Sequence, residues 1–221
     1  MKHLLKSLLV IAICAMPVIA MAQQPESCSV KPTGAKATIK DFARAYCTQC
    51  DEGGFEREAL AAFNKGNSKD CVVDTKNGYV KYSAKQDDGS IETIEMCFWN
   101  CNNKNEKLVA VNRVNNGMGF DESFLNFYRY NVKTKEMKLI DLPFNREPQP
   151  VDMLNKAKAS KKIINLVKSA ENEDANKYQP CYQLPRVGKD ITFRMADPTA
   201  VPKAMQRTGT MKWNGASFAL N

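Results

Sequence analysis

The spacing of apolar residues predicts one or two short helices near the N-terminus. Residues 39–46 suit a short helix. Residues 55–64 suit a clearer one, because they are rich in strong helix formers and place Phe55, Leu60 and Phe63 on one side. We expect that side to dock on a sheet.

From Val72 onward apolar positions alternate with polar ones, which is the period of a strand that buries one face. Turns rich in Asn and Gly separate the segments, so consecutive strands should pair antiparallel. The pattern predicts a β-rich α+β fold, an antiparallel meander of about 8–10 strands with one or two short N-terminal helices. The expected strands flank 77–78 and cover 91–99, 107–113, 123–130, 136–140, 178–184, 190–195 and 210–220, the last folded as a hairpin.

Three Asn-Gly pairs, at 77–78, 116–117 and 214–215, predict where the chain reverses between strands. A two-residue turn at Asn77-Gly78 would pair Val73 with Tyr82. After the second pair, residues 123–130 carry aromatic side chains on both faces, which indicates a central strand covered on both sides. The third pair, Asn214-Gly215, predicts a hairpin with an apolar face formed by Met211, Trp213, Ala216, Phe218 and Leu220.

Residues 1–22 have the features of a cleaved export signal. A start containing Lys2 and Lys6 and an apolar stretch from Leu8 to Ala20 lead to the small-x-small site Ala20-Met21-Ala22, before Gln23. We therefore expect an exported protein, periplasmic or secreted. No later apolar stretch has the length of a transmembrane span, so none is expected.

Residues 23–221 are expected to form a single β-rich domain. Prolines within 142–151 mark a possible sub-boundary, but the chain that follows has few large apolar residues for a core of its own. Residues 151–170 suit either a helix or a strand, and the helix is favoured.

Composition narrows the possible functions. The only histidine, His3, lies in the leader, so the mature chain cannot use Ser-His-Asp or Cys-His catalysis or a His-containing zinc site. It also lacks the Gly-x-Ser-x-Gly and phosphate-cradling Gly-x-x-x-x-Gly-Lys motifs. Most hydrolase classes are thereby excluded. The formal charge of the full chain is +8, and a basic excess suits a polyanionic partner, but its lysines are scattered, so a solvated basic surface is favoured.

Seven cysteines follow the leader. In an exported protein their default role is disulfide formation, and an odd number leaves at least one without a partner in the chain. Cys97 and Cys101 would lie about 13 Å apart in one extended strand, so they can bond only if the chain turns at Asn100. The disulfide candidates are Cys28, Cys47, Cys50, Cys71, Cys97, Cys101 and Cys181.

The pair Cys47 and Cys50 has three interpretations. A thioredoxin-like redox pair would sit at a helix N-terminus, but the acids at 51 and 52 would raise its thiol pKa. A four-thiolate zinc site would add Cys97 and Cys101. Structural disulfides fit an exported chain and are favoured.

Other residues offer weaker candidates. Three acidic pairs could act as glycosidase acid and base, although their turn-like sequence favours solvated loop charges: Asp87/Asp88, Asp121/Glu122 and Glu171/Asp174. Trp99 and Trp213 are candidates for stacking on a ligand, although their strand periodicity favours the core. No catalytic, metal-binding or cofactor-binding residue is assigned.

The stretch 184–191, Leu-Pro-Arg-Val-Gly-Lys-Asp-Ile, and the closing stretch 212–218, Lys-Trp-Asn-Gly-Ala-Ser-Phe, carry a resemblance. Together with the leader, they resemble small secreted β-rich proteins of Gram-negative bacteria. The shared features are structural, so the resemblance implies export and a β-rich fold and assigns no functional residue.

The expected function is that of an exported binding or interaction protein with an unknown ligand. Its partner would be a protein or glycan in the cell envelope or outside the cell; neither nucleic acid nor a cofactor is expected. One alternative is a histidine-free enzyme that uses carboxylates or a thiol, such as a glycan hydrolase. Another is an inhibitor or accessory subunit of a cell-surface assembly.

Overall fold

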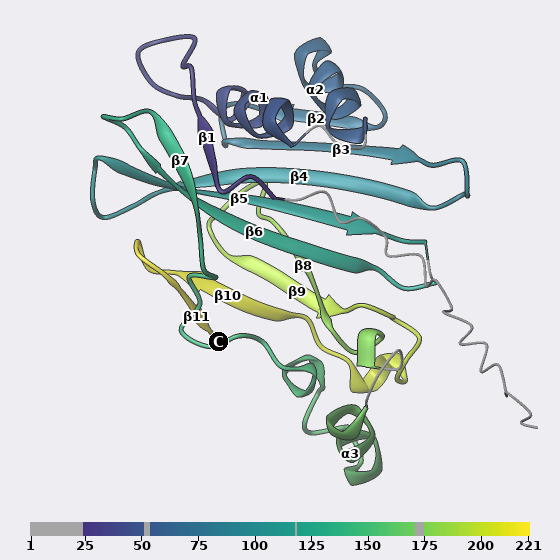
Figure 1. Cartoon of the computed structure of the whole chain (residues 1–221). Helices are drawn as coiled ribbons and strands as arrows, with labels where there is room; N and C mark the ends of the chain where they lie inside the picture. Colours follow the sequence, from purple (N-terminus) through teal and green to yellow (C-terminus); the bar gives the residue numbers. More distant parts are fainter. Residues whose placement is uncertain (1–23, 51–53, 118, 171–174) are drawn as a thin grey trace, which may run out of the picture.

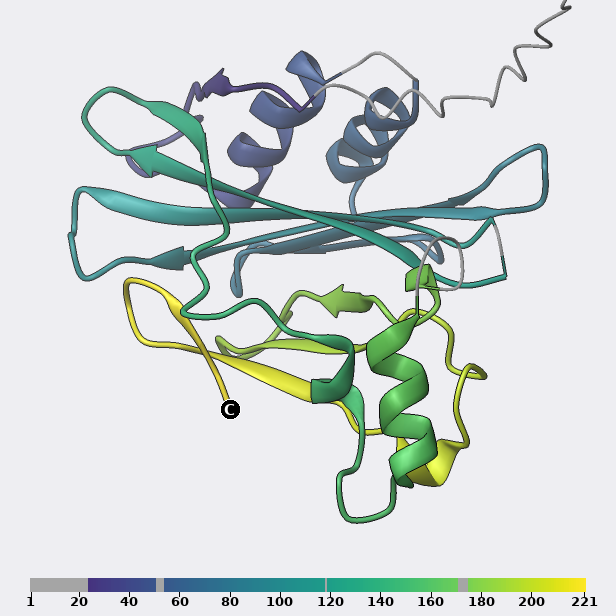
Figure 2. The same ribbon diagram turned by 60° about the horizontal axis from the view of Figure 1, so that its bottom comes forward.

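The computed structural model describes residues 24–50, 54–117, 119–170 and 175–221, so the expected leader, 1–22, lies outside the described residues. Two antiparallel sheets and three α-helices make up this part of the chain. The helices α1 (Ile39–Gln49) and α2 (Phe55–Lys65) cover one face of the larger sheet, and the smaller sheet covers the other (Figures 1 and 2). The β-rich α+β fold with N-terminal helices is confirmed.

The larger sheet, sheet A, has the strand order β1-β7-β6-β5-β4-β3-β2. Six of its strands are neighbours in the chain as well as in the sheet, as expected for a meander. The short strand β1 is added beside β7, where Cys28 pairs with Met137. The strands are β1 (Ser27–Ser29), β2 (Cys71–Asp74), β3 (Tyr79–Lys85), β4 (Ile91–Asn100), β5 (Glu106–Asn115), β6 (Glu122–Asn131) and β7 (Glu136–Ile140).

The turn between β2 and β3 corrects the expected register. Val73 pairs with Val80, so its expected pairing with Tyr82 is wrong, and the turn has four residues instead of two. The Asp74 carboxylate explains the longer turn, because it accepts hydrogen bonds from the backbone and side-chain nitrogens of Asn77. A shift of two residues leaves every side chain on its expected face.

Sheet A is buried on both faces. On the helix side, Phe42 of α1 packs edge-on against Phe98 and Tyr130, with ring centres 5.4 and 4.9 Å apart. Along β6, Tyr128 belongs to this core, whereas Phe127 belongs to the core on the opposite side. The prediction that this strand is central and covered on both faces is confirmed.

The smaller sheet, sheet B, has the strand order β11-β10-β9-β8. The final hairpin forms around Asn214-Gly215 as predicted, with Trp213 paired to Phe218. Its Met211 and Phe218 are buried against sheet A. The expected place of Ala216 on this apolar face is wrong, because residues 214–217 form the turn and Ala216 is exposed in it. The strands are β8 (Pro180–Gln183), β9 (Ile191–Met195), β10 (Gly209–Trp213) and β11 (Phe218–Leu220).

The segment between the sheets crosses from β7 to β8. Residues 142–151, the possible sub-boundary, begin this crossing. Within the ambiguous stretch 151–170, the structure has a 3-10 helix, η1 (Pro150–Met153), and then α3 (Lys161–Ser169), which begins where Ser160 caps the Ile163 N–H. Another 3-10 helix, η2 (Lys203–Met205), precedes β10. No helix in the described part of the chain has the length and apolarity of a membrane span.

Candidate functional site

The face of sheet A that meets sheet B is apolar at one end and polar at the other. At the apolar end, Trp99 and Phe127 pack against sheet B. At the polar end, β4, β5 and β6 contribute Glu95, Asn112 and Ser123, respectively. The two ends therefore offer different chemistry within one interface.

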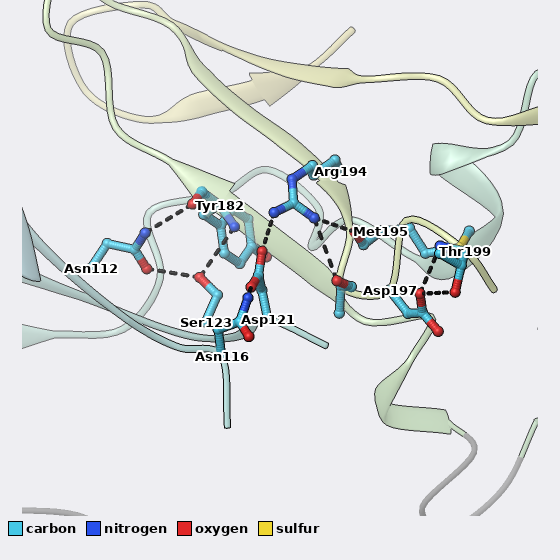
Figure 3. A network of polar contacts seen from close by, with 10 residues as sticks. Asn112, Asn116, Asp121, Ser123, Tyr182, Arg194, Met195, Asp197 and Thr199 are labelled. Carbon is cyan, nitrogen blue, oxygen red and sulfur yellow. Dashed lines mark hydrogen bonds and ion pairs between the residues drawn. The ribbon is translucent and has the colours of Figure 1, made fainter. Parts of the chain in front are cut away.

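Glu95, Asn112 and Ser123 bind the outer edge of β8. Asn112 Nδ2 donates to the Tyr182 carbonyl over 2.9 Å, and Ser123 Oγ accepts from the Tyr182 N–H over 3.1 Å (Figure 3). The Glu95 carboxylate accepts from the Leu184 N–H over 2.8 Å. These side chains thus satisfy backbone groups that an edge strand would otherwise leave unpaired.

The Glu95 carboxylate is almost fully engaged by protein groups. Besides the Leu184 N–H, it accepts from the Tyr79 hydroxyl over 2.8 Å and from Asn112 Nδ2 over 2.9 Å. Burial raises the pKa of Glu95 above its usual value, while its hydrogen-bond donors act in the opposite direction. With an exposed fraction of 5%, this carboxylate holds the two sheets together and offers little surface to a substrate.

A groove of about 380 Å³ opens beside this junction and is lined in part by Glu95, Asp121, Cys181 and Arg194. Asp121 forms an ion pair with Arg194 of β9 (Figure 3). It also accepts from Asn116 Nδ2 over 2.9 Å. The second carboxylate of the groove is therefore neutralised and oriented by neighbouring side chains.

The Cys181 thiol is the one cysteine in the lining of this groove. Burial raises its pKa to about 11, although the nearby Arg194 acts in the opposite direction. The thiolate is the nucleophilic form, so at neutral pH this thiol is a weak nucleophile. The arrangement does not resemble an activated thiol site.

A second pocket, of about 350 Å³, lies at the opposite ends of the sheet A strands. The loop between β1 and α1, the β4–β5 turn and the β6–β7 turn meet there. We call it the lysine pocket, because these segments and β5 contribute Lys36, Lys104, Lys107 and Lys135.

The lysine pocket has an excess of positive charge. Among the described residues, Lys36, Lys104 and Lys135 form no ion pair. The lining contains one acid, Glu106, and its carboxylate is 3.2 Å from Arg129. The described side chains therefore leave these three lysines available to an anion.

Lys107 is the least exposed of the four lysines. Its Nζ donates to Asn100 Oδ1 over 2.6 Å and lies 4.5 Å from the centre of the Phe98 ring. Burial lowers the pKa of Lys107, and the positive charge of Lys36 lowers it further. A negative charge placed between these ammonium groups would offset their repulsion.

Sheet A separates the cysteines predicted as disulfide candidates. Cys28, Cys47, Cys50 and Cys71 lie in the core on the helix side, whereas Cys97 and Cys101 lie on the side of sheet B, and Cys181 lies in the groove. The four-thiolate zinc site considered above would need thiols from both faces of the sheet, so this geometry does not support it. Within the described ranges, no three Cys, His, Asp or Glu side chains are grouped as metal ligands.

Helix α1 ends at Gln49, so Cys47 and Cys50 lie at its C-terminal end. The redox interpretation required the opposite end, because the positive end of a helix dipole stabilises a thiolate and the negative end does not. Cys97 and Cys101 lie along the extended β4 strand and the residue after it, without the turn at Asn100 that a bond between them would require.

The two candidate stacking residues lie in the aromatic cluster between the sheets. Trp99 is 4% exposed, and its indole N–H donates to the Lys189 carbonyl over 2.8 Å. The Trp213 ring is 6.0 Å from that of Trp99 and 4.8 Å from that of Phe218. Trp213 keeps partial exposure at the edge of this cluster.

The three acidic pairs considered as glycosidase candidates lie in different parts of the chain and do not share one site. Asp88 accepts from the Ser90 N–H over 2.9 Å within its own turn. Asp121 lies in the groove, as described, and Glu171 and Asp174 lie outside the described residues.

Sequence reasoning did not identify the residues of the sheet junction or of the lysine pocket. For the junction a signal exists: Glu95 alternates with Cys97 and Trp99, and Asn112 with Ala110, so both polar residues occupy inward positions of their strands. The pocket lysines come from separate segments, and their convergence depends on the fold.

Comparison of this chain with protein-family models, curated proteins and solved structures finds no match.

Proposed function

We propose that this chain is an exported binding protein and that its lysine pocket accommodates an anionic group of a glycan. The observation that carries the proposal is the convergence on one pocket of four lysines that form no ion pair with the described residues. The pocket volume, about 350 Å³, lies within the usual range for small ligands.

The charges favour an anion over a neutral ligand. An ammonium group attracts carboxylate, sulfate or phosphate without strict geometry, because its three donors rotate on a flexible stem. Lys107 is partly desolvated and repelled by Lys36, so a bound anion would gain from both lysines. Such binding should weaken as salt screens the charges.

The shape of the surface favours a glycan over a protein partner. A protein interface usually centres on a contiguous apolar patch. The exposed large apolar side chains lie on five different elements or turns: Ile91, Val132, Leu139, Leu166 and Val187. A concave pocket with an apolar lining from Pro32, Ala35 and Val132 better suits one end of an acidic sugar chain.

The alternative of a histidine-free enzyme rests on the groove between the sheets. Two carboxylates and a thiol line it, but Glu95 holds β8, Asp121 is paired with Arg194 and the Cys181 pKa is raised to about 11. These interactions favour structural roles for the two carboxylates and the thiol, so binding is better supported than catalysis as the function of this chain. An inhibitor or accessory subunit remains the second alternative, and it would need a protein surface other than the lysine pocket.

Calorimetric titration of residues 23–221 with a uronic-acid oligosaccharide tests this proposal. We expect binding to the acidic chain and at least tenfold weaker binding to a neutral oligosaccharide of equal length. The variant Lys36→Gln/Lys104→Gln should weaken acidic binding, whereas Lys158→Gln/Lys162→Gln, with the same loss of charge on exposed residues around α3, should not.

Two results would contradict the glycan proposal. One is equal binding of the neutral and acidic chains, and the other is equal weakening by both double variants, which would indicate non-specific attraction. Binding of a poly-glutamate peptide but not of the sugar would favour a protein partner. Export is tested separately by the intact mass of the exported protein. We expect it to equal the mass of residues 23–221, less any disulfide hydrogens.

A further inference from the structure

The last turn of α1 is fastened to the edge strand β1. With the Gln49 amide oriented so that its nitrogen faces the Ser27 carbonyl, the orientation that satisfies both of its polar groups, it donates to that carbonyl over 2.9 Å and accepts from the Ser29 N–H over 3.2 Å. These groups flank Cys28, which is fully buried and turned toward the helix-side core. Cys50 follows Gln49 directly and is 1% exposed in the same core. Cys28 and Cys50 therefore both adjoin the contact between the Gln49 side chain and the backbone of β1.

The two thiols also share surroundings. Burial and, as the smaller cause, the nearby Cys50 together raise the pKa of Cys28 to about 12. Burial raises the pKa of Tyr128 on β6, and Cys28 and Cys50 both contribute to the rise. Cys50 thus acts electrostatically on Cys28, and both thiols act on the same tyrosine, which places all three side chains in one buried cluster.

The topology of sheet A excludes most other partners for Cys28. Cys71 lies on β2, at the opposite edge of the sheet from β1. Six strand spacings separate those edges, about 29 Å, far beyond the reach of a disulfide. Cys97, Cys101 and Cys181 are excluded because they lie on the other face of the sheet.

We propose that Cys28 and Cys50 form a disulfide bond that ties β1 to the end of α1. Cys47 lies almost one helical turn earlier, whereas Cys50 adjoins the residue that holds β1. The two thiols lose two protons and two electrons, and a disulfide such as oxidised glutathione accepts them and leaves as two thiols. One S–S bond forms in the protein and one breaks in the oxidant.

The bond should form before α1 packs on β1. A thiolate has to attack the oxidant, and in the folded protein burial keeps Cys28 protonated at neutral pH. An exposed chain has no such barrier. Oxidation should therefore be fast during refolding and slow once reduced protein has folded.

Peptide mapping of the full chain tests the pairing. The protein is refolded with reduced and oxidised glutathione, alkylated in denaturant without reduction and digested with trypsin. Cleavage after Lys36 and Arg44 separates Cys28 from the peptide that holds both Cys47 and Cys50, whereas the Lys31-Pro32 bond resists trypsin. We expect these two peptides to be linked, with a mass two hydrogens below their sum, and fragmentation between Thr48 and Gln49 to place the link on Cys50.

Matched variants sharpen the result. Cys47→Ala should retain the link and Cys50→Ala should leave Cys28 open to alkylation. The proposal is overturned if Cys28 of the wild-type chain is alkylated, if fragmentation places its link on Cys47 or on another cysteine, or if Cys47→Ala abolishes the link. Mapping of the wild type decides the question even if a variant does not fold.

Discussion

The carboxylate of Glu95 accepts a hydrogen bond from the backbone N–H of Leu184, 2.8 Å away and 89 positions later in the chain. Glu95 belongs to sheet A, and Leu184 directly follows β8, the edge strand of sheet B. A buried acid thus takes the place of a neighbouring strand at the junction of the two sheets. This relationship explains why a carboxylate is tolerated in the interface and why it is not free for catalysis.

Replacing Glu95 with alanine should destabilise the fold strongly. The change would remove the acceptor of the Tyr79 hydroxyl, of the Leu184 N–H and of one of the two bonds that the Asn112 amide donates, its bond to the Tyr182 carbonyl being kept. With about 1–3 kcal/mol for each buried unsatisfied group, we expect a loss of about 3 kcal/mol or more in urea unfolding. Asp87→Ala, at an exposed turn position, is the control. Equal unfolding free energies for the two variants would contradict this role of Glu95.

The stability contributed by Glu95 should depend on pH in a defined direction. Because burial raises its pKa in the folded state, the folded protein holds this proton at pH values where the unfolded chain has lost it. Stability from this group is therefore present below the unfolded pKa, about 4.3, and is lost as pH rises through the higher folded value.

Glu95→Gln provides the comparison, since glutamine does not titrate. The stability of the wild type relative to this variant should increase as pH is lowered through that window. The measurement is urea unfolding of both proteins between pH 4 and pH 8, about the range in which a raised carboxyl pKa falls. A constant difference, or one that grows with rising pH, would show that the direction is wrong.

Two buried tyrosines should respond oppositely to loss of their hydroxyl groups. The Tyr79 hydroxyl donates to Glu95 over 2.8 Å, whereas the Tyr128 hydroxyl is buried without a hydrogen-bond partner among the described residues. Tyr79→Phe should therefore destabilise by about 1 kcal/mol or more, and Tyr128→Phe should be neutral or stabilising. Thermal unfolding of the two variants and the wild type checks this. A larger loss of stability in Tyr128→Phe than in Tyr79→Phe would contradict it, because the Tyr128 hydroxyl would then have a hydrogen-bond partner.

Gly209 should not tolerate a side chain. It pairs across strands with Phe193, and a Cβ at position 209 would overlap the Phe193 ring, which is 1% exposed. We expect Gly209→Ala to destabilise by about 1–3 kcal/mol, as for an overfilled core. Gly34→Ala is the matched control, because a Cβ there meets nothing within 4 Å. Equal melting temperatures for these two variants would mean that Phe193 moves aside at little cost.

Much of the strand content could be predicted because each strand buries a face. The period of two is clear in β4, where Trp99 and Cys97 face sheet B and Phe98 and Met96 face the helices. The position of helix α2 could be predicted as well, because its residues are strong helix formers. The register of strand pairing at Val73 could not be predicted, because it depends on the hydrogen bonds of one side chain, Asp74, and not on periodicity.

The division of the strands into two sheets, the groove between the sheets and the lysine pocket could not be predicted from the sequence. Periodicity shows that Glu95 points inward, but not that the inward face meets the edge of β8. The charge of the lysine pocket arises from Lys36, Lys104 and Lys135, which lie in a loop and two turns separated by tens of residues. Only the meander, which brings these turns to one end of the sheet, makes them neighbours.

The most direct test of anion binding is the pKa of Lys107, measured from its Nζ and adjacent methylene signals in an NMR titration. In the free protein we expect a pKa below the usual lysine value of about 10.4, because burial and Lys36 both disfavour the charged form. Saturation with the uronic-acid oligosaccharide should raise that pKa, since a bound carboxylate stabilises the ammonium, whereas the neutral oligosaccharide should leave it unchanged. An unchanged Lys107 pKa in the presence of bound acidic sugar would contradict the account, because the ligand would then occupy another part of the surface.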